Sequence, residues 1–191
     1  MTRTLLSAAF ALCLTATGAL AQDWTLNPDT SRLAFGSVKN HNIGEVHTFE
    51  GLNGTVSRDG NVVVEIPLTG VSTNIDIRNE RLGEHVFAGA PTATLTGTID
   101  MAEFKSLRPG KSDIIEMDAV LSFLGQDVDV STELFVVRTS ARSVMVTTND
   151  MVMLTTEDLG IDAGIDILQQ LANLEDITRV TPVTIRFVFE R

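Results

Sequence analysis

Tyrosine is absent from this sequence, tryptophan and cysteine occur once each, and aromatic residues make up only 5% of the chain. Surfaces that bind single-stranded nucleic acid stack the bases on aromatic side chains and follow the phosphates with basic ones. Here 25 acidic residues outnumber 14 basic residues, and the formal net charge is −11. The composition therefore argues against nucleic acid and against anionic membrane surfaces as partners.

Recognisable catalytic motifs are also missing. The sequence contains no Gly-rich phosphate loop, no Gly-x-Ser-x-Gly elbow and no His-Glu-x-x-His pair. The three histidines are His41, His47 and His85, and nothing in their spacing fixes them around one metal ion. We therefore predict neither a catalytic residue nor a metal site. A metal-dependent enzyme built on these histidines stays as an alternative.

The first 21 residues have the features of a cleavable signal peptide. Arg3 gives a positive start, an apolar run follows from Leu5 to Leu14, and Ala19-Leu20-Ala21 fits a small-x-small cleavage site. The run is shorter than the roughly 20 residues of a membrane-spanning helix. Cleavage would make Gln22 the first residue, remove the only cysteine, Cys13, and change the net charge from −11 to −12, because Arg3 is lost and no acidic residue goes with it. We expect a periplasmic protein without thiol chemistry.

Residues 22–191 form a single predicted domain, because no linker, charge block or internal repeat divides them. A chain of this size buries roughly 70% of its unfolded surface, so it can be stable without disulfides.

Alternation of apolar and polar residues with a period of two runs through most of the domain and predicts strands with one buried face. Arg58-Asp59-Gly60-Asn61 and Gly125-Gln126 supply turn signals between such strands. The predicted strands are 24–26, 32–38, 45–56, 62–69, 92–101, 115–123, 127–136, 145–146 and 183–189.

Two segments break the alternation. Residues 76–87 carry apolar residues at spacings that suit one or two helical turns, and residues 162–175 predict a clearer amphipathic helix that Asp162 could cap. The predicted fold class is all-β, an extended antiparallel barrel of about eight strands with one or two short flanking helices. A β-sandwich is the structural alternative, since alternation alone does not separate the two.

Large flexible apolar side chains are abundant, with nine phenylalanines and six methionines in a chain that is 43% hydrophobic. Such side chains fill a core, and they also line tunnels for flexible hydrocarbon ligands. Composition by itself leaves a filled barrel and a hollow barrel equally open.

Six segments, in order along residues 24–189, resemble the YceI-like family of exported, polyisoprenoid-binding proteins. They include a Trp-led opening with a Ser-x-x-x-Phe strand, a segment with recurring Phe and Gly, and a Ser/Thr strand end that runs into an Arg-led helical turn. The segments are 24–35, 45–54, 71–82, 87–91, 157–161 and 180–189. Departures occur at Arg81, where many relatives have a histidine nearby, and at Leu159, where Phe is common.

The resemblance implies a lipocalin-like barrel that shelters an isoprenoid lipid, such as an isoprenoid quinone, in an apolar tunnel without chemistry or a required cofactor. A small outer-membrane β-barrel is a second alternative. We expect the tunnel to be lined by Phe35, Ile66, Leu68, Leu95, Met117, Phe123, Phe135 and Met145. His47, Arg78 and His85 are the expected residues of a polar mouth, although a salt bridge from Arg78 to Glu80 or Glu84 is an equal reading.

The partners expected from this reading are the lipid or quinone itself and a redox partner at the inner membrane. A homodimer also stays open, because the sequence does not determine the oligomeric state.

Overall fold

The computed structural model describes residues 23–191, so the predicted signal peptide lies outside the described residues. Twelve strands, all paired antiparallel, make up about half of this part of the chain. The strands are β1 (Trp24–Leu26), β2 (Arg32–Lys39), β3 (Ile43–Phe49), β4 (Asn53–Val56), β5 (Asn61–Pro67), β6 (Val71–Ser72), β7 (Thr92–Thr98), β8 (Ser112–Phe123), β9 (Gln126–Arg138), β10 (Ser143–Thr148), β11 (Val152–Thr155) and β12 (Val180–Glu190). The helical elements are η1 (Leu68–Gly70), α1 (Asp76–Arg81), η2 (Leu82–Val86), α2 (Met101–Ser106) and α3 (Asp162–Leu171).

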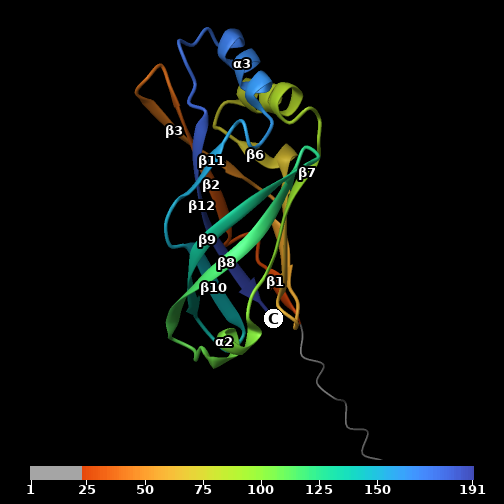
Figure 1. Cartoon of the computed structure of the whole chain (residues 1–191), viewed down its shortest axis with the longest axis vertical. Helices are drawn as coiled ribbons and strands as arrows, with labels where there is room; N and C mark the ends of the chain where they lie inside the picture. The colour runs from red at the N-terminus through yellow and green to blue at the C-terminus, as the bar shows by residue number, and fades with distance from the viewer. Residues whose placement is uncertain (1–22) are drawn as a thin grey trace, which may run out of the picture.

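Eight of the strands close into a ring, in the order β1-β4-β5-β7-β8-β9-β10-β12, and β12 pairs again with β1. The prediction of an extended antiparallel barrel of about eight strands is therefore confirmed, and the sandwich alternative is wrong. β2 and β3 extend the wall beyond β1 and β4, because β12 pairs with β1 near its end and with β2 nearer its start. The result is an elongated barrel (Figure 1).

Helices cover the two ends of this barrel. α1, η2 and α3 gather at the end that holds β3 and β6, while α2 lies at the opposite end, near the C-terminus (Figure 1). The helices predicted at 76–87 and 162–175 are thus present. None of the helices between residues 23 and 191 has the length and apolar character needed to cross a membrane.

Several element boundaries differ from the prediction. The strand expected at 45–56 is two strands, because the chain turns at Gly51, whose φ is +73°. The strand expected to reach Met101 ends at Thr98, since Asp100 accepts a hydrogen bond from the Ala102 N–H and begins α2 instead. The β8–β9 turn uses Leu124 and Gly125, both at positive φ, one residue earlier than expected.

The start of α3 also differs from the prediction. Ile161 is the N-cap residue, and Asp162 lies in the first turn, where its carboxylate accepts the Thr156 hydroxyl instead of capping the helix. A negative charge in the first turn still favours the helix through its dipole.

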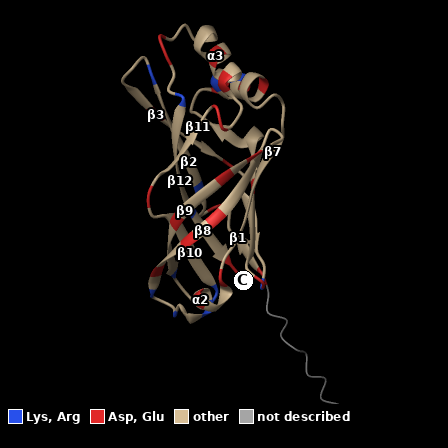
Figure 2. Cartoon of the chain, in the orientation of Figure 1, with Lys and Arg blue, Asp and Glu red and all other residues tan. Residues whose placement is uncertain are grey.

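Acidic residues occupy the outward face of β8 and β9, as red segments along these strands show (Figure 2). Asp127 and Asp129 belong to this exposed face, and the alternate residues Val128 and Val130 are buried or half-buried. The period-two pattern therefore separates a charged outside from an apolar inside, as expected for a barrel wall in water.

Candidate functional site

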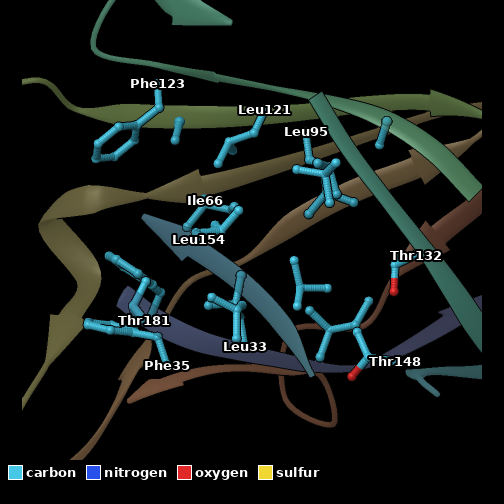
Figure 3. A pocket seen from close by; sticks show the side chains of 18 of the residues that line it. Leu33, Phe35, Ile66, Leu95, Leu121, Phe123, Thr132, Thr148, Leu154 and Thr181 are labelled. Carbon is cyan, nitrogen blue, oxygen red and sulfur yellow. The ribbon is translucent and has the colours of Figure 1, made fainter. Parts of the chain in front are cut away.

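A continuous apolar cavity occupies the inside of the barrel (Figure 3). Every strand of the eight-stranded ring contributes to its wall, together with η1, η2 and α3. No charged residue lines it. Apart from the Trp24 indole, the polar side chains of the wall are hydroxyls, which belong to Ser37, Thr132, Thr148, Thr156, Thr178 and Thr181. A wall of this composition suits a long hydrocarbon and gives few groups that could carry out a reaction.

Most hydroxyls in the wall already have partners within the protein. Thr181 donates to the Gly36 carbonyl, Thr156 donates to Asp162, and Thr178 accepts from the Val38 N–H. These hydroxyls are therefore engaged in holding strands and loops together, and the cavity presents mainly hydrocarbon to a guest.

Six of the eight residues expected to line a tunnel are in the cavity wall, and their contact with a ligand stays a prediction. They are Phe35, Ile66, Leu68, Leu95, Met117 and Phe123. Leu68 reaches the wall from η1 and not from a strand.

The predicted tunnel positions of Phe135 and Met145 are wrong. The neighbouring residues Leu134 and Val136 on β9, and Val144 and Val146 on β10, line the cavity instead. Because successive side chains of a strand point to opposite faces, Phe135 and Met145 face outward. Both strands are apolar on both faces at these points, so size and hydrophobicity misled the choice of face.

The sequence-based list also missed part of an aromatic row along one end of the cavity. The Phe35 ring stacks on Phe49 at 5.2 Å between centroids, Phe49 lies 6.0 Å from Phe87, and Phe87 lies 6.1 Å from Phe123. Phe49 could have been found from its position on the same face of the strand as His47. Phe87 follows η2, where no strand period applies, and only the packing of that segment places it here.

The inner face of the β2–β3 hairpin changes from apolar to polar along its length. The facing pairs run from Leu33 and Phe49, through Phe35 and His47, to Ser37 and Glu45, and then to Lys39 and Ile43. The first pair lies in the cavity wall, and the later pairs reach the hairpin tip. This face therefore leads from the hydrocarbon cavity to a polar end of the barrel.

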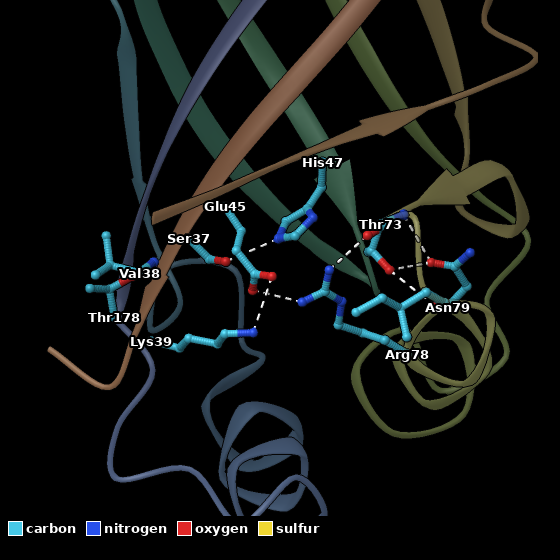
Figure 4. A network of polar contacts seen from close by, with 10 residues as sticks. Ser37, Val38, Lys39, Glu45, His47, Thr73, Arg78, Asn79 and Thr178 are labelled. Atoms are coloured by element: carbon cyan, nitrogen blue, oxygen red, sulfur yellow. Dashed lines mark hydrogen bonds and ion pairs between the residues drawn. The ribbon is translucent and has the colours of Figure 1, made fainter. Parts of the chain in front are cut away.

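A network centred on Glu45 occupies that polar end (Figure 4). Arg78, on α1, donates from Nη1 to Glu45 at 2.7 Å and from Nη2 to the Thr73 carbonyl at 2.7 Å. Lys39 Nζ lies 3.1 Å from the other oxygen of Glu45. The salt bridge expected from Arg78 to Glu80 or Glu84 is thus made to Glu45 instead, because β3 and α1 meet here. The network joins the hairpin to the helical cap.

His47 lies between this network and the cavity. It is 5% exposed, its Nε2 is 3.0 Å from Ser37 Oγ, and its ring is 5.1 Å from the Phe35 ring between centroids. The structure therefore brings His47 and Arg78 to the same end of the barrel and adds Lys39 and Glu45, which sequence reasoning missed. That this end is the mouth of the cavity stays a prediction. Lys39 and Glu45 lie on the same inner face of the hairpin as His47, and this shared face is the feature of the sequence that could have identified them.

Two ionisable groups of this end have shifted pKa values. Burial lowers the pKa of His47, and the nearby charge of Arg78 lowers it further, so both disfavour the protonated imidazole. Burial alone would raise the pKa of Glu45, but the hydrogen bonds and charges of Lys39 and Arg78 outweigh it and lower the pKa. The site thus combines two basic side chains, one carboxylate and an imidazole whose protonated form is disfavoured.

The other two histidines lie elsewhere. His85, on η2, is 3.8 Å from Glu84 and not in the Glu45 network, and its place at the mouth stays a prediction. His41 is exposed at the tip of the β2–β3 hairpin and hydrogen-bonds Asp176 at 2.6 Å. Within residues 23–191, no cluster of three His, Cys, Asp or Glu side chains is arranged to hold a metal ion.

Comparison with solved structures finds other proteins with a similar fold. A polyisoprenoid-binding domain from Saccharophagus degradans, implicated in plant cell wall breakdown, superposes with a TM-score of 0.85 and 32% sequence identity, over 87% of this chain and 97% of that domain. BcnA from Burkholderia cenocepacia matches with a TM-score of 0.66 and 12% identity, over 85% of this chain and 98% of BcnA. A YceI protein from Campylobacter jejuni matches with a TM-score of 0.48 and 14% identity, over 72% of this chain and 82% of that protein.

No protein-family model matches the sequence, and no curated protein matches it. The Saccharophagus domain nevertheless shares about a third of its residues with this chain over nearly its whole length. Together with the closed barrel and the ordered motifs of residues 24–189, this similarity shows that the chain belongs to the YceI-like family.

Proposed function

We propose that this protein is a periplasmic carrier that shelters an isoprenoid lipid, such as an isoprenoid quinone, in its barrel cavity and performs no chemistry on it. The observation that carries the proposal is the uncharged cavity wall to which all eight strands of the ring contribute. The polyisoprenoid-binding domain that is 32% identical supports the same ligand class.

The physical need for such a carrier follows from the cost of exposing hydrocarbon to water. Each methylene moved out of water gains about 0.8 kcal/mol, so a polyprenyl tail does not cross an aqueous compartment unshielded. A closed barrel satisfies the backbone hydrogen bonds in its own wall and leaves only side chains to face the guest. A closed barrel with an apolar interior is therefore sufficient for the proposed carrier.

Lipid extraction tests the ligand. Protein purified from its own host without detergent should release an isoprenoid species, identified by mass spectrometry of an organic extract. Stripped protein should then take up added isoprenoid quinone. Protein that is free of lipid and takes up none would refute the carrier proposal.

Fractionation tests the compartment. We expect the protein to be released by osmotic shock without detergent and to begin at Gln22 by N-terminal sequencing. Retention in the outer membrane until detergent is added would favour the alternative of an outer-membrane barrel, and retention of residues 1–21 on the released protein would contradict the signal peptide.

A further inference from the structure

The outer surface of the barrel carries its charge unevenly. On β8 and β9 the outward positions include five carboxylates, which belong to Glu116, Asp118, Asp127, Asp129 and Glu133. The outward face of β3, β2, β12 and β11 has no charged residue where these four strands lie side by side. Its nine residues are Gly44, Val46 and Thr48 of β3, Ala34, Gly36 and Val38 of β2, Pro182 and Thr184 of β12, and Met153 of β11. We call these nine residues the uncharged face.

The direction of the uncharged face follows from the cavity. Successive side chains of a strand point to opposite sides, and the neighbours of these residues in the sequence point inward. The neighbours that line the cavity are Phe35, Ser37, Phe49, Val152, Leu154, Thr181, Val183 and Ile185. The uncharged face therefore meets water and has no part in the cavity wall.

The largest side chains of the uncharged face form a ridge across the four strands. Val46 is paired with Gly36, and a Cβ added to Gly36 would lie 2.9 Å from Cγ of the Pro182 ring. Pro182 is in turn paired with Met153. Val46 is 64% exposed and Met153 is 57% exposed, so both ends of the ridge stand in solvent.

A row of smaller side chains runs beside the ridge. It consists of the paired residues Thr48, Ala34 and Thr184. When a second copy is turned by a twofold rotation, the ridge of each copy can lie against the low row of the other, as side chains of packed sheets interdigitate. The shape of the uncharged face is therefore complementary to itself.

The charge of the chain restricts where two copies can meet. The net charge is −11, so two copies repel each other across most of their surfaces. The border of the uncharged face is instead positive, because Arg32 and Arg186 are directly opposite each other on the outward side. Neither arginine takes part in the ion pairs formed among residues 23–191. These two cations reduce the repulsion of an approaching acidic copy.

We propose that the uncharged face is the dimer interface of this protein, formed by two copies related by a twofold axis. A lipid bilayer suits the face less well, because the face has no aromatic residue to insert among head groups and the negative chain is repelled by anionic lipids. This inference does not depend on the ligand of the cavity.

The area of the face sets the expected strength of the dimer. Four strands and three rows of side chains cover roughly 300 Å² of sheet, and the exposed side chains of Met151 and Val180 lie at its edge. Stable interfaces bury about 800 Å² on each partner. We therefore expect a reversible dimer with a Kd of roughly 1–100 µM.

Sedimentation velocity of the purified protein, over roughly 1–500 µM, measures this equilibrium. Val46→Glu and Met153→Glu each place a carboxylate on the ridge, so that every dimer buries two unpaired charges. Each variant should weaken the dimer by at least about a hundredfold and leave the urea midpoint of the monomer near that of the wild type. Val63→Glu is the matched control, because Val63 is an exposed valine of β5, outside the uncharged face. It should leave dimerisation unchanged.

Three results would overturn the proposal. The first is a wild type that stays monomeric up to about 500 µM, five times the upper end of the expected Kd range. The second is a dimer that neither ridge variant weakens, or that Val63→Glu weakens as much. The third concerns flotation with vesicles of phosphatidylethanolamine and phosphatidylglycerol. If the wild type floats with these vesicles and Val46→Glu does not, the face binds a bilayer instead of a second copy.

Discussion

Gly164 decides how closely α3 can approach η2. A Cβ added at this position would lie 2.8 Å from the Cα of Val86 and would also meet the backbone carbonyl of His85, and neither backbone atom can move without its element. Glycine in a helix is usually a weakness of about 1 kcal/mol relative to alanine. Here its small size allows the helical cap to seat over the cavity, where Ile165 and Leu168 of α3 are buried.

We therefore expect Gly164→Ala to destabilise the protein by about 1–3 kcal/mol, the usual cost of overpacking, against the normal trend of helix propensity. Urea unfolding measures the change. Gly83→Ala, in η2, is the control: no atom lies within 4 Å of its added Cβ, so it should be neutral or stabilising by up to about 1 kcal/mol. Equal effects of both variants would contradict the packing argument.

His47 should make stability depend on pH in a defined window. Its pKa is lowered in the folded protein, first by burial and then by Arg78, from an ordinary value of 6.5. As the pH falls below about 6.5, the unfolded chain takes up a proton that the folded chain resists, so the stability contributed by neutral His47 is complete above that pH and is lost below it.

Urea unfolding of wild type and His47→Phe between pH 8 and pH 5 checks this expectation. The wild type should lose more free energy of unfolding across this range than the variant. Glu45 acts in a separate window: its pKa is lowered from 4.5, so its contribution is present above about pH 4.5 and is lost only at lower pH. Parallel pH curves for the two proteins would show that His47 is not the titrating group.

At the scale of elements, the alternation along β9 determines how much a substitution lowers the free energy of unfolding. Leu134 is 5% exposed and lines the cavity, whereas its neighbour Phe135 is 36% exposed and pairs with Ile114 on the outward face. Phe135 is larger, but only the inward residue belongs to the closed wall.

Leu134→Ala should thus cost about 2–5 kcal/mol in the free energy of unfolding. Phe135→Ala should cost about 1 kcal/mol or less, the scale of an exposed cross-strand pair. Chemical denaturation of the two variants measures the difference. A larger loss for Phe135→Ala would mean that β9 is turned the other way in the barrel.

Elements also show how far sequence reasoning reaches. Alternation alone predicts the strands β5, β8 and β12 and their inward faces, because each has polar residues on its outward face. In β10 and the end of β9 both faces are apolar. The period of two therefore predicts a strand there but does not predict which face points into the barrel. The boundary of α2 depended on one hydrogen bond of Asp100, which competes locally with the strand pattern.

At the scale of the whole molecule, the cavity should couple ligand binding to stability. A ligand that binds only the folded barrel stabilises it by RT ln(1 + [L]/Kd). The melting temperature of stripped protein should therefore rise when an isoprenoid quinone is added. The rise should grow with the number of isoprene units until the chain fills the cavity, and then level off.

Thermal unfolding followed by circular dichroism, with quinones of increasing tail length, measures this shift. Leu134→Arg, which places a charge in the uncharged wall, should show a much smaller shift than the outward control Phe135→Arg. A shift that does not depend on tail length would point to binding at the surface.

The sequence by itself determined the class of the protein. Its alternation predicted the strands, its acidic outward residues predicted which faces meet water, and the order of its motifs indicated the family. Local patterns suffice for these features, because period, turn chemistry and charge act between residues close in the chain. The tertiary structure decided the rest. Only the closure of β12 on β1 encloses the cavity, and only the meeting of β3 with α1 sets Arg78 beside Glu45 and His47. These contacts join residues far apart in sequence, and no local period encodes them.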